Sequence, residues 1–260
     1  DRDEPSGAAR RSQIMRQIGR LRAVYKRTPP GIVRMKAAAC FVIAGACLPG
    51  QQERYLDRGL DWLDDEIDLQ ILADGGHISR APEDVAKALH ILLTTEAALE
   101  ARGQEGSKEI RRAIDRLTPM LNFFTASDGR LFSFNGGGRE SVPALAALNA
   151  AAGLKAKQFS YAPHTKYERL ERNGSVIMMD TGASPPRPFD LHAHTAPLAF
   201  ELTTADGPLI VNCGWNDAQG RHWRDSMRAT AAHSTLILGG RSAGVFLDKG
   251  IGAKLLGTAI

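Results

Sequence analysis

The chain has 260 residues, of which 43% are hydrophobic and 24% are charged, a composition typical of a core-forming domain that argues against disorder. No hydrophobic run approaches the length of a membrane span. The net charge of +4 is local, because residues 1–36 carry ten Lys and Arg against three Asp and Glu (+7), whereas the remainder carries 23 against 26 (−3). No nucleic-acid motif accompanies this basic segment, which we interpret as a solvated helix face.

Hydrophobic residues recur at helical spacing through the first part of the chain and predict a helical half. Serines suited to capping precede three of the segments, and prolines or glycines follow most of them. Short connections between six such helices favour antiparallel helix pairs wrapped into a toroid or a layered array. The predicted helices cover about residues 12–27, 32–48, 52–73, 82–103, 107–121 and 141–153.

After about residue 155 the hydrophobic pattern changes from helical to alternating, which predicts antiparallel strands and therefore an α+β chain. Asn173 and Gly174 lie between two alternating runs and are typical of a β-hairpin turn. A proline-rich loop over residues 182–190 follows the hairpin. Further strands are predicted at residues 198–204, 208–213 and 228–238.

Four of the seven histidines lie between residues 190 and 238, in strand-like surroundings. In an extended strand His192 and His194 point to the same face, and His233 on another strand can meet them. Three histidines brought together in this way suit a metal site or a proton-transfer site. The alternative is that each one is an ordinary core or surface histidine.

Three segments together resemble the heparinase II/III family of polysaccharide lyases: HAHTAPLAFEL, LIVNCG and WRDSMRATAAHSTL. The segment DGGHISRAPEDV, at residues 74–85, is similar to the part of that family's toroid that contributes a polar catalytic residue. The resemblance implies an (α/α) toroid portion over residues 1–155 and an antiparallel β-sandwich portion over residues 156–260. Family members have a longer sandwich, so we expect this one to be truncated at Ile260.

The resemblance also implies a reaction, the β-elimination of a 4-linked uronic acid in an acidic polysaccharide, glycosaminoglycan-like or polyuronate. Such a site must neutralise the carboxylate beside C5, remove the C5 proton and protonate the leaving O4. Carried over by motif, His192 and His77 are the expected catalytic residues, and Arg80, Asn135 and Arg228 are the expected substrate-binding residues. The alternatives are a helix-end histidine at His77, a turn residue at Asn135 and a brace within the sandwich at Arg228.

A metal site is implied as well, with His194, Asn212 and His233 as ligands and zinc as the expected metal. The family usually has an acidic ligand where this chain has Asn212, and a neutral amide binds zinc more weakly than a carboxylate. Either Asp217 or Glu201 is then a candidate substitute, and Asn212 is alternatively a turn residue after a buried strand.

A second departure concerns the catalytic tyrosine that the family usually places in the toroid, because no tyrosine lies between Tyr55 and Tyr161. Tyr161 or Tyr167 reaches the site, another group transfers the proton, or the protein is a weak or inactive lyase. The competing hypotheses are therefore a glycan-binding cell-envelope protein with lyase architecture and a metal-dependent hydrolase that uses His192 with the two metal-ligand histidines.

The resemblance implies a location in the periplasm or cell envelope. Residue 1 does not begin a signal peptide, so a cytoplasmic location stays open. The sequence indicates neither the polysaccharide nor the oligomeric state.

Overall fold

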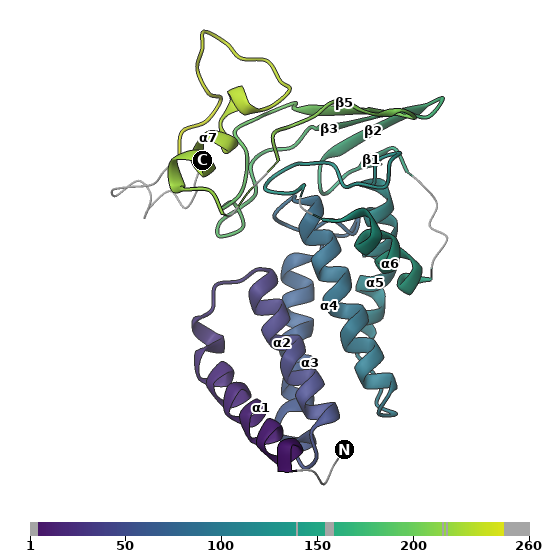
Figure 1. Ribbon diagram of the computed structural model, residues 1–260, viewed down its shortest axis with the longest axis vertical. Coiled ribbons are helices and arrows are strands. Elements are labelled where there is room, and N and C mark those ends of the chain that lie inside the picture. Colours follow the sequence, from purple (N-terminus) through teal and green to yellow (C-terminus); the bar gives the residue numbers. More distant parts are fainter. Residues whose placement is uncertain (1–4, 139, 154–158, 215, 217, 247–260) are drawn as a thin grey trace.

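The computed structural model describes residues 5–138, 140–153, 159–214, 216 and 218–246. Helices form the first half, and an antiparallel sheet lies across one end of them in the second half (Figure 1). This order confirms the α+β prediction. The closed toroid, the second layer of a sandwich and the truncation stay predictions.

The helical half contains six α-helices among the described residues, and all six correspond to predicted segments. The first begins at Pro5, so Ser12 lies inside it and does not cap it. Ser107 and Ser141 do cap their helices, since their hydroxyls accept from the N–H groups of Ile110 at 3.2 Å and Ala144 at 3.4 Å. The elements are α1 (Pro5–Val24), η1 (Tyr25–Arg27), α2 (Ile32–Cys47), α3 (Gln52–Gln70), α4 (Pro82–Glu100), α5 (Lys108–Phe123) and α6 (Val142–Ala152).

The apolar helix α2 packs against α3 at short range, through two glycines. A Cβ at Gly45 would lie 2.5 Å from the backbone nitrogen of Leu56, and one at Gly59 would lie 2.7 Å from that of Val42. Both contacts are shorter than side chains tolerate. The helices therefore approach one another through their backbones, which buries α2 as its all-round hydrophobicity requires.

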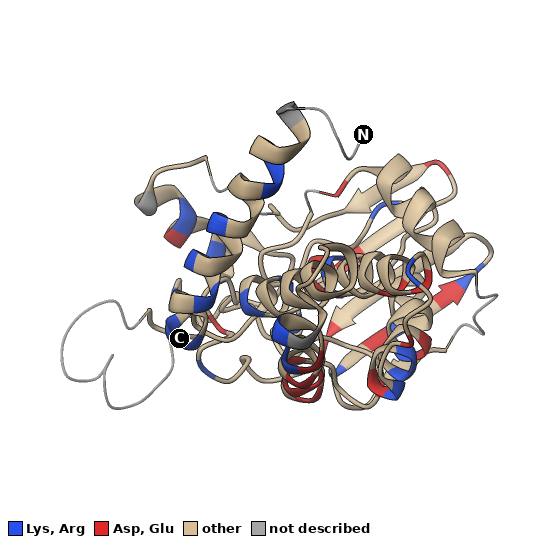
Figure 2. Cartoon of the chain, turned by 90° about the horizontal axis from the view of Figure 1, so that it is seen from below, with Lys and Arg blue, Asp and Glu red and all other residues tan. Residues whose placement is uncertain are grey.

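Five basic residues of the N-terminal segment lie on α1, at the edge of the helical half (Figure 2). Arg10, Arg16, Arg20 and Arg22 are exposed. The part of the segment on α1 is therefore a solvated helix face, as interpreted from sequence, whereas Arg34 on α2 pairs with the buried Glu66 at 2.6 Å.

The sheet has the strand order β1-β2-β3-β4-β5, and every neighbouring pair is antiparallel. Asn173 and Gly174 form the β2–β3 turn with φ values of 51° and 76°, as a hairpin turn of this kind requires. One face of the sheet, including Tyr167 and Met178, is buried. The strands are β1 (Tyr161–Ala162), β2 (Tyr167–Arg172), β3 (Ser175–Asp180), β4 (Phe200–Thr204) and β5 (Gly207–Ile210).

Two expectations for the last part of the chain are wrong. Residues 228–238 were expected to form a strand, but the helix α7 (Arg221–Arg228) and the short helix η2 (Thr230–Ala232) occupy its start, and the segment joins none of the five strands. The backbone of this segment bonds to a loop, as when Thr195 N donates to Arg228 O at 2.8 Å, and to the start of β4, where Phe200 N donates to Ser234 O at 3.1 Å. His222 and Trp223 lie in the first turn of α7.

The H-x-H segment is also not an extended strand. Ala193 N donates to Asp190 O at 3.1 Å, which closes a turn at this point. Alternation along a strand therefore does not place the side chains, and His192 is exposed while His194 is partly buried.

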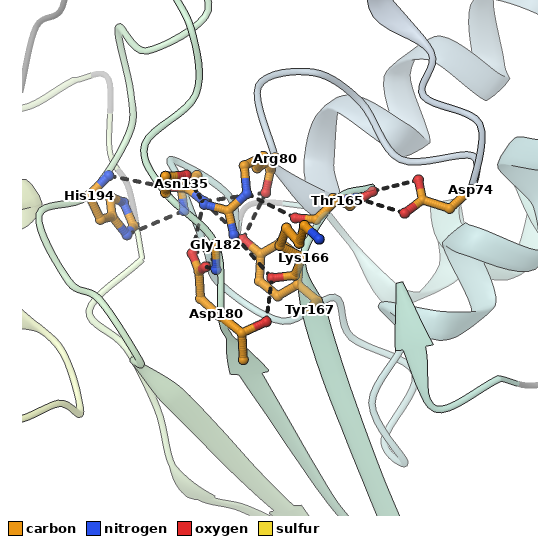
Figure 3. A network of polar contacts seen from close by, with 11 residues as sticks. Asp74, Arg80, Asn135, Thr165, Lys166, Tyr167, Asp180, Gly182 and His194 are labelled. Carbon is orange, nitrogen blue, oxygen red and sulfur yellow. Dashed lines mark hydrogen bonds and ion pairs between the residues drawn. The ribbon is translucent and has the colours of Figure 1, made fainter. Parts of the chain in front are cut away.

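The two halves are joined by Arg80, which comes from the loop before α4 and enters the sheet half (Figure 3). Its guanidinium donates to the carbonyl oxygens of Thr165 at 2.9 Å and Ala183 at 2.6 Å and forms an ion pair with Asp180. It also lies over the ring of Tyr167, 5.0 Å from the centroid. Arg80 has a φ of 60°, a conformation that non-glycine residues rarely adopt, so these contacts hold the loop in an uncommon shape.

Asp74 makes a second connection between the halves (Figure 3). Its carboxylate accepts hydrogen bonds from the backbone N–H groups of His164 at 2.8 Å and Thr165 at 2.7 Å. The two glycines that follow are required by space: a Cβ at Gly75 would lie 2.0 Å from Arg116 O, and one at Gly76 would lie 1.7 Å from Thr165 Oγ1. The Asp-Gly-Gly sequence thus forms the turn and also lets the helical half contact the sheet half closely.

We expect Arg80→Ala to lower the free energy of unfolding by about 3–5 kcal/mol, because the substitution leaves the buried Asp180 carboxylate without its partner. Urea denaturation followed by circular dichroism measures the change. Arg112→Ala, which removes an exposed ion pair with Glu109 on α5, is the control and should change stability by less than about 0.5 kcal/mol. Equal effects of the two substitutions would contradict the role of Arg80.

Candidate functional site

A cleft of about 930 Å³ lies where the helical half meets the loops of the sheet half. Its walls are mostly apolar and come from the start of α2, from α4 and from the loop before β4. Pyranose rings have apolar faces, and walls of this kind with a few polar groups suit them. The polar residues of the lining include Lys36, His77, Ser79, Glu83, Asp84, Lys87, Asn135 and His192.

His77 and His192 line the same cleft although they are far apart in sequence. His192 belongs to the loop of the sheet half and is exposed. The glycine-rich loop before α6 makes room for it: a Cβ at Gly136 would lie 2.6 Å from His192 Cβ, and Gly136 has a φ of 93°. The two expected catalytic residues are therefore brought to one place from opposite halves.

The ring of His77 is 1% exposed, and both of its nitrogens have partners. Nε2 lies 2.9 Å from Gln70 Oε1, and Nδ1 lies 2.7 Å from Ser79 Oγ. Burial lowers the pKa of His77, although the nearby Asp84 opposes the shift. Burial thus favours the uncharged form of His77, which lies at the edge of the cleft and presents no unoccupied nitrogen to a substrate.

Ser79, Asp84 and the Glu83–Lys87 pair are cleft residues that we did not single out from sequence. Lys87 Nζ lies 2.6 Å from Glu83 and 3.7 Å from Asp84. Acidic residues in the first turn of a helix are ordinarily explained by the helix dipole, so Glu83 and Asp84 carried no functional signal. The sequence signal that could have identified Asp84 was its position in the same short segment as His77, DGGHISRAPEDV.

Asn135 lines the cleft, but its amide is bonded inward (Figure 3). Its nitrogen donates to Tyr167 Oη at 2.8 Å and to Arg80 O at 3.3 Å, and its oxygen accepts from His194 N at 3.1 Å. Asn135 has a φ of 50°, which asparagine tolerates better than most residues. Its contacts position the loop rather than present donors to the cleft.

Arg80 and Arg228 are not among the residues that line the cleft. Arg80 is occupied by the junction between the halves. Arg228 donates to Ala193 O at 2.8 Å and to Asp190 O at 3.2 Å, and it packs over the ring of Phe246 at 4.6 Å. These contacts correspond to the bracing alternative for Arg228, since they hold the loop that carries His192.

None of the four tyrosines of the chain lines the cleft. Tyr25 and Tyr55 are in the helical core, and Tyr161 is 45% exposed on β1. Tyr167 is buried, and burial together with Asp180 raises its pKa well above the usual value. Tyr167 therefore stays protonated inside the junction, and neither it nor Tyr161 supplies the missing tyrosine in this arrangement.

The expected metal ligands do not form a metal site as they are placed. Within the described part of the chain, no group of three or more His, Cys, Asp or Glu is suited to a metal ion. His194 and His233 stack with ring centroids 4.2 Å apart. The two nitrogens of His194 face the backbone N–H groups of Asn135 at 3.3 Å and Gly136 at 3.0 Å, so neither points to a shared ion.

His233 and Asn212 differ from His194 in their hydrogen bonds. Among the described residues, neither buried ring nitrogen of His233 has a partner in good hydrogen-bond geometry. Burial lowers the pKa of His233 to about 4, and the nearby Met227 backbone opposes the shift. The oxygen of Asn212 accepts from Ser234 N at 3.2 Å. Glu201 accepts from the N–H of Asn212 at 2.9 Å, and Asp217 lies outside the described residues. A metal would need His194 to turn.

The second half of the chain matches a known family: residues 155–259 correspond to "Heparinase II/III-like, C-terminal". The chain is also similar to FtsZ-localized protein C of Caulobacter vibrioides (strain NA1000 / CB15N). The identity is 35% over 225 residues, which cover 86% of this chain and 38% of that relative. This chain therefore spans well under half of the length of the curated relative.

Two solved structures show the same architecture at low sequence identity. A heparan sulfate lyase HepC mutant from Pedobacter heparinus is 20% identical, with a TM-score of 0.66 and coverage of 80% of this chain and 37% of that one. Heparinase III is 14% identical, with a TM-score of 0.64 and coverage of 82% and 40%. The chain therefore has the heparinase II/III-like fold, and its residues 155–259 match the heparinase II/III-like C-terminal family.

Proposed function

We propose that the cleft binds a uronic-acid-containing polysaccharide and that the protein is a lyase that cleaves it by β-elimination. The observation that carries this proposal is the position of His77 and His192 on one cleft, supplied by opposite halves of the molecule. The similarity to heparinase-like structures supports the same class of substrate.

In the proposed reaction His192 removes the C5 proton, because its imidazole is exposed in the cleft and belongs to the H-x-H segment of the family resemblance. His90 on α4 is a second exposed histidine of the lining, outside that segment. The C5–H bond breaks as the C4–C5 double bond forms and the C4–O4 bond breaks. The carboxylate beside C5 must be neutralised during this step. Lys36 is an exposed cation in the lining, whereas Lys87 is paired with Glu83, so Lys36 is the ammonium group that we assign to the substrate carboxylate.

A second candidate function is glycan binding without turnover. Two observations favour it: the cleft has no tyrosine in its lining, and Arg80 and Arg228 donate to protein acceptors outside the lining. Such a protein would keep the cleft of a lyase and lack an effective pair of proton-transfer groups.

The location of the protein stays a prediction. The resemblance to polysaccharide lyases predicts the periplasm or cell envelope, whereas the curated relative is named for its localisation with FtsZ. Within the residues that the structure describes, no helix has both the length and the hydrophobicity needed to span a membrane.

We expect incubation with polyuronates and glycosaminoglycans to produce the ultraviolet absorbance of an unsaturated uronate for at least one polymer. His192→Ala should lower kcat/KM for that polymer by about a hundredfold or more, because general base catalysis is lost. His222→Ala, at an exposed histidine on α7 that does not line the cleft, is the matched control and should leave the rate unchanged.

Binding to the same panel of polymers separates the two candidate functions. Saturable binding without unsaturated product would favour the glycan-binding protein. The absence of both binding and product, with a folded full-length protein, would contradict both.

For zinc, which stays a proposal, we expect Asn212→Asp to raise the affinity by at least about tenfold, since a carboxylate is a better zinc ligand than an amide. Calorimetric titration of the metal-free protein measures the affinity. Asn216→Asp, at an exposed position in the loop before α7, controls for the added charge. Equal zinc affinity in the wild type and Asn212→Asp would show that Asn212 is not part of a metal site.

A further inference from the structure

A chain of hydrogen bonds leads from the helical core to the cleft through four side chains. Gln70 Oε1 lies 2.9 Å from His77 Nε2, and His77 Nδ1 lies 2.7 Å from Ser79 Oγ. Ser79 Oγ in turn lies 2.7 Å from Asp84 Oδ2. His77 is 1% exposed, whereas the side chain of Asp84 is 22% exposed and lines the cleft. One end of the chain is therefore dry and the other can meet a ligand.

Gln70 determines which nitrogen of His77 carries the proton. The amide nitrogen of Gln70 donates to Glu66 Oε2 at 2.6 Å and to Gly31 O at 3.2 Å, so its oxygen is left as an acceptor. His77 Nε2 must donate to that oxygen. The N–H of Ser79 points at Nδ1 from 3.1 Å, which favours an unprotonated Nδ1.

The hydroxyl of Ser79 then has one proton for two short contacts. If it donates to His77 Nδ1, the contact with Asp84 is a hydrogen bond only when Asp84 supplies a proton. If it donates to Asp84, the contact with Nδ1 is a hydrogen bond only when the imidazole is protonated. In both cases the unit of His77, Ser79 and Asp84 holds one proton more than a neutral histidine beside an ionised aspartate. Moving two protons along the chain converts one form into the other.

Asp84 is the most exposed side chain of this unit, so the proton leaves at the Asp84 end. Lys87 lies 3.7 Å from Asp84 Oδ1 and pairs with Glu83 at 2.6 Å. On the buried side, Phe189 meets the His77 ring edge-on at 6.2 Å between centroids. Gln70 cannot accept a proton, so the route from His77 runs through Ser79 to the carboxyl group in the cleft.

We propose that Asp84 is the general acid that protonates O4 in the elimination, and that Ser79 and His77 are positioning residues that return a proton to it. This inference rests on the proposed lyase function and gives the role of the missing tyrosine to Asp84. His192 gains the C5 proton while Asp84 gives its proton to O4. The proton that Asp84 gives is the one extra proton of the unit. When His77 holds it, the Nδ1 proton passes to Ser79 as the Ser79 hydroxyl proton passes to Asp84, and after the transfer to O4 the unit is a neutral His77 beside an ionised Asp84.

Asp84→Asn and two substrates test this proposal. The variant keeps an acceptor for Ser79 but has no proton to give. On a natural polymer, whose leaving group is a sugar alkoxide, we expect kcat to fall by about a hundredfold or more with KM changed by less than about threefold. On a uronate with a nitrophenyl ether at C4, whose leaving group needs no acid, the variant should remain within about threefold of wild type. Asp206→Asn, an exposed residue in the β4–β5 turn, is the control.

Ser79→Ala and Ser79→Thr test the relay itself. The alanine variant should lose rate on the natural polymer and shift the acidic limb of its pH–rate profile, and the threonine variant should restore both because it keeps a hydroxyl. A purely structural role would lower thermal stability without moving the profile. These variants also carry the test if Asp84→Asn does not fold.

Three outcomes are distinguishable. Wild-type protein that makes no unsaturated product from either substrate contradicts the proposed function, and with it this inference. An active wild type whose Asp84→Asn variant loses the same factor on both substrates, or loses nothing, overturns the role of Asp84 alone.

Discussion

The position of the two halves relative to one another depends on the buried guanidinium of Arg80. A buried charge is tolerated only when a partner and acceptors surround it, and here the sheet half supplies Asp180 and backbone carbonyls for a group that comes from the helical half. The loop that carries Arg80 also carries His77 and Ser79. Satisfying one arginine therefore places the cleft edge of the helical half against the sheet, and the distances in the cleft follow from it.

The polar residues of the motif segments separate into two sets with different tasks. Arg80, Asn135 and Arg228 bond to protein groups and give the cleft its shape. His192 and Asp84 face the cleft, with His77 behind them. For the proposed polysaccharide, a cleft whose cations are few and whose walls are mostly apolar would contact ring faces and make a small number of charged contacts. This differs from a basic groove, which would bind polyanions by charge alone.

Much of the architecture was predictable because it depends on local patterns. Helical spacing, capping serines and the Asn-Gly turn act within a few residues, and the helices and the β2–β3 hairpin agree with them. The predictions for residues 228–238 and for the H-x-H segment were wrong for a common reason. Alternating residues in both segments suggested strands. In the structure the backbone of one segment bonds to that of the other, as between Thr195 N and Arg228 O, and the hydrophobic period of a segment does not reveal a bonding partner that is distant in sequence. Family resemblance directed attention to the right segments, although it did not separate the residues that shape the cleft from those that face it.

The amino-acid sequence by itself determined the order of helices before strands and the places where the chain turns. It also determined that histidines from both halves are candidates for one site. Only the tertiary structure decided which side chains are available for chemistry. Availability depends on hydrogen-bond partners that are distant in sequence, such as Asp180 for Arg80, Tyr167 for Asn135 and Asn135 for His194. It also showed Ser79 and Asp84 beside His77, since the contact exists only where the chain folds back after α3 and begins α4.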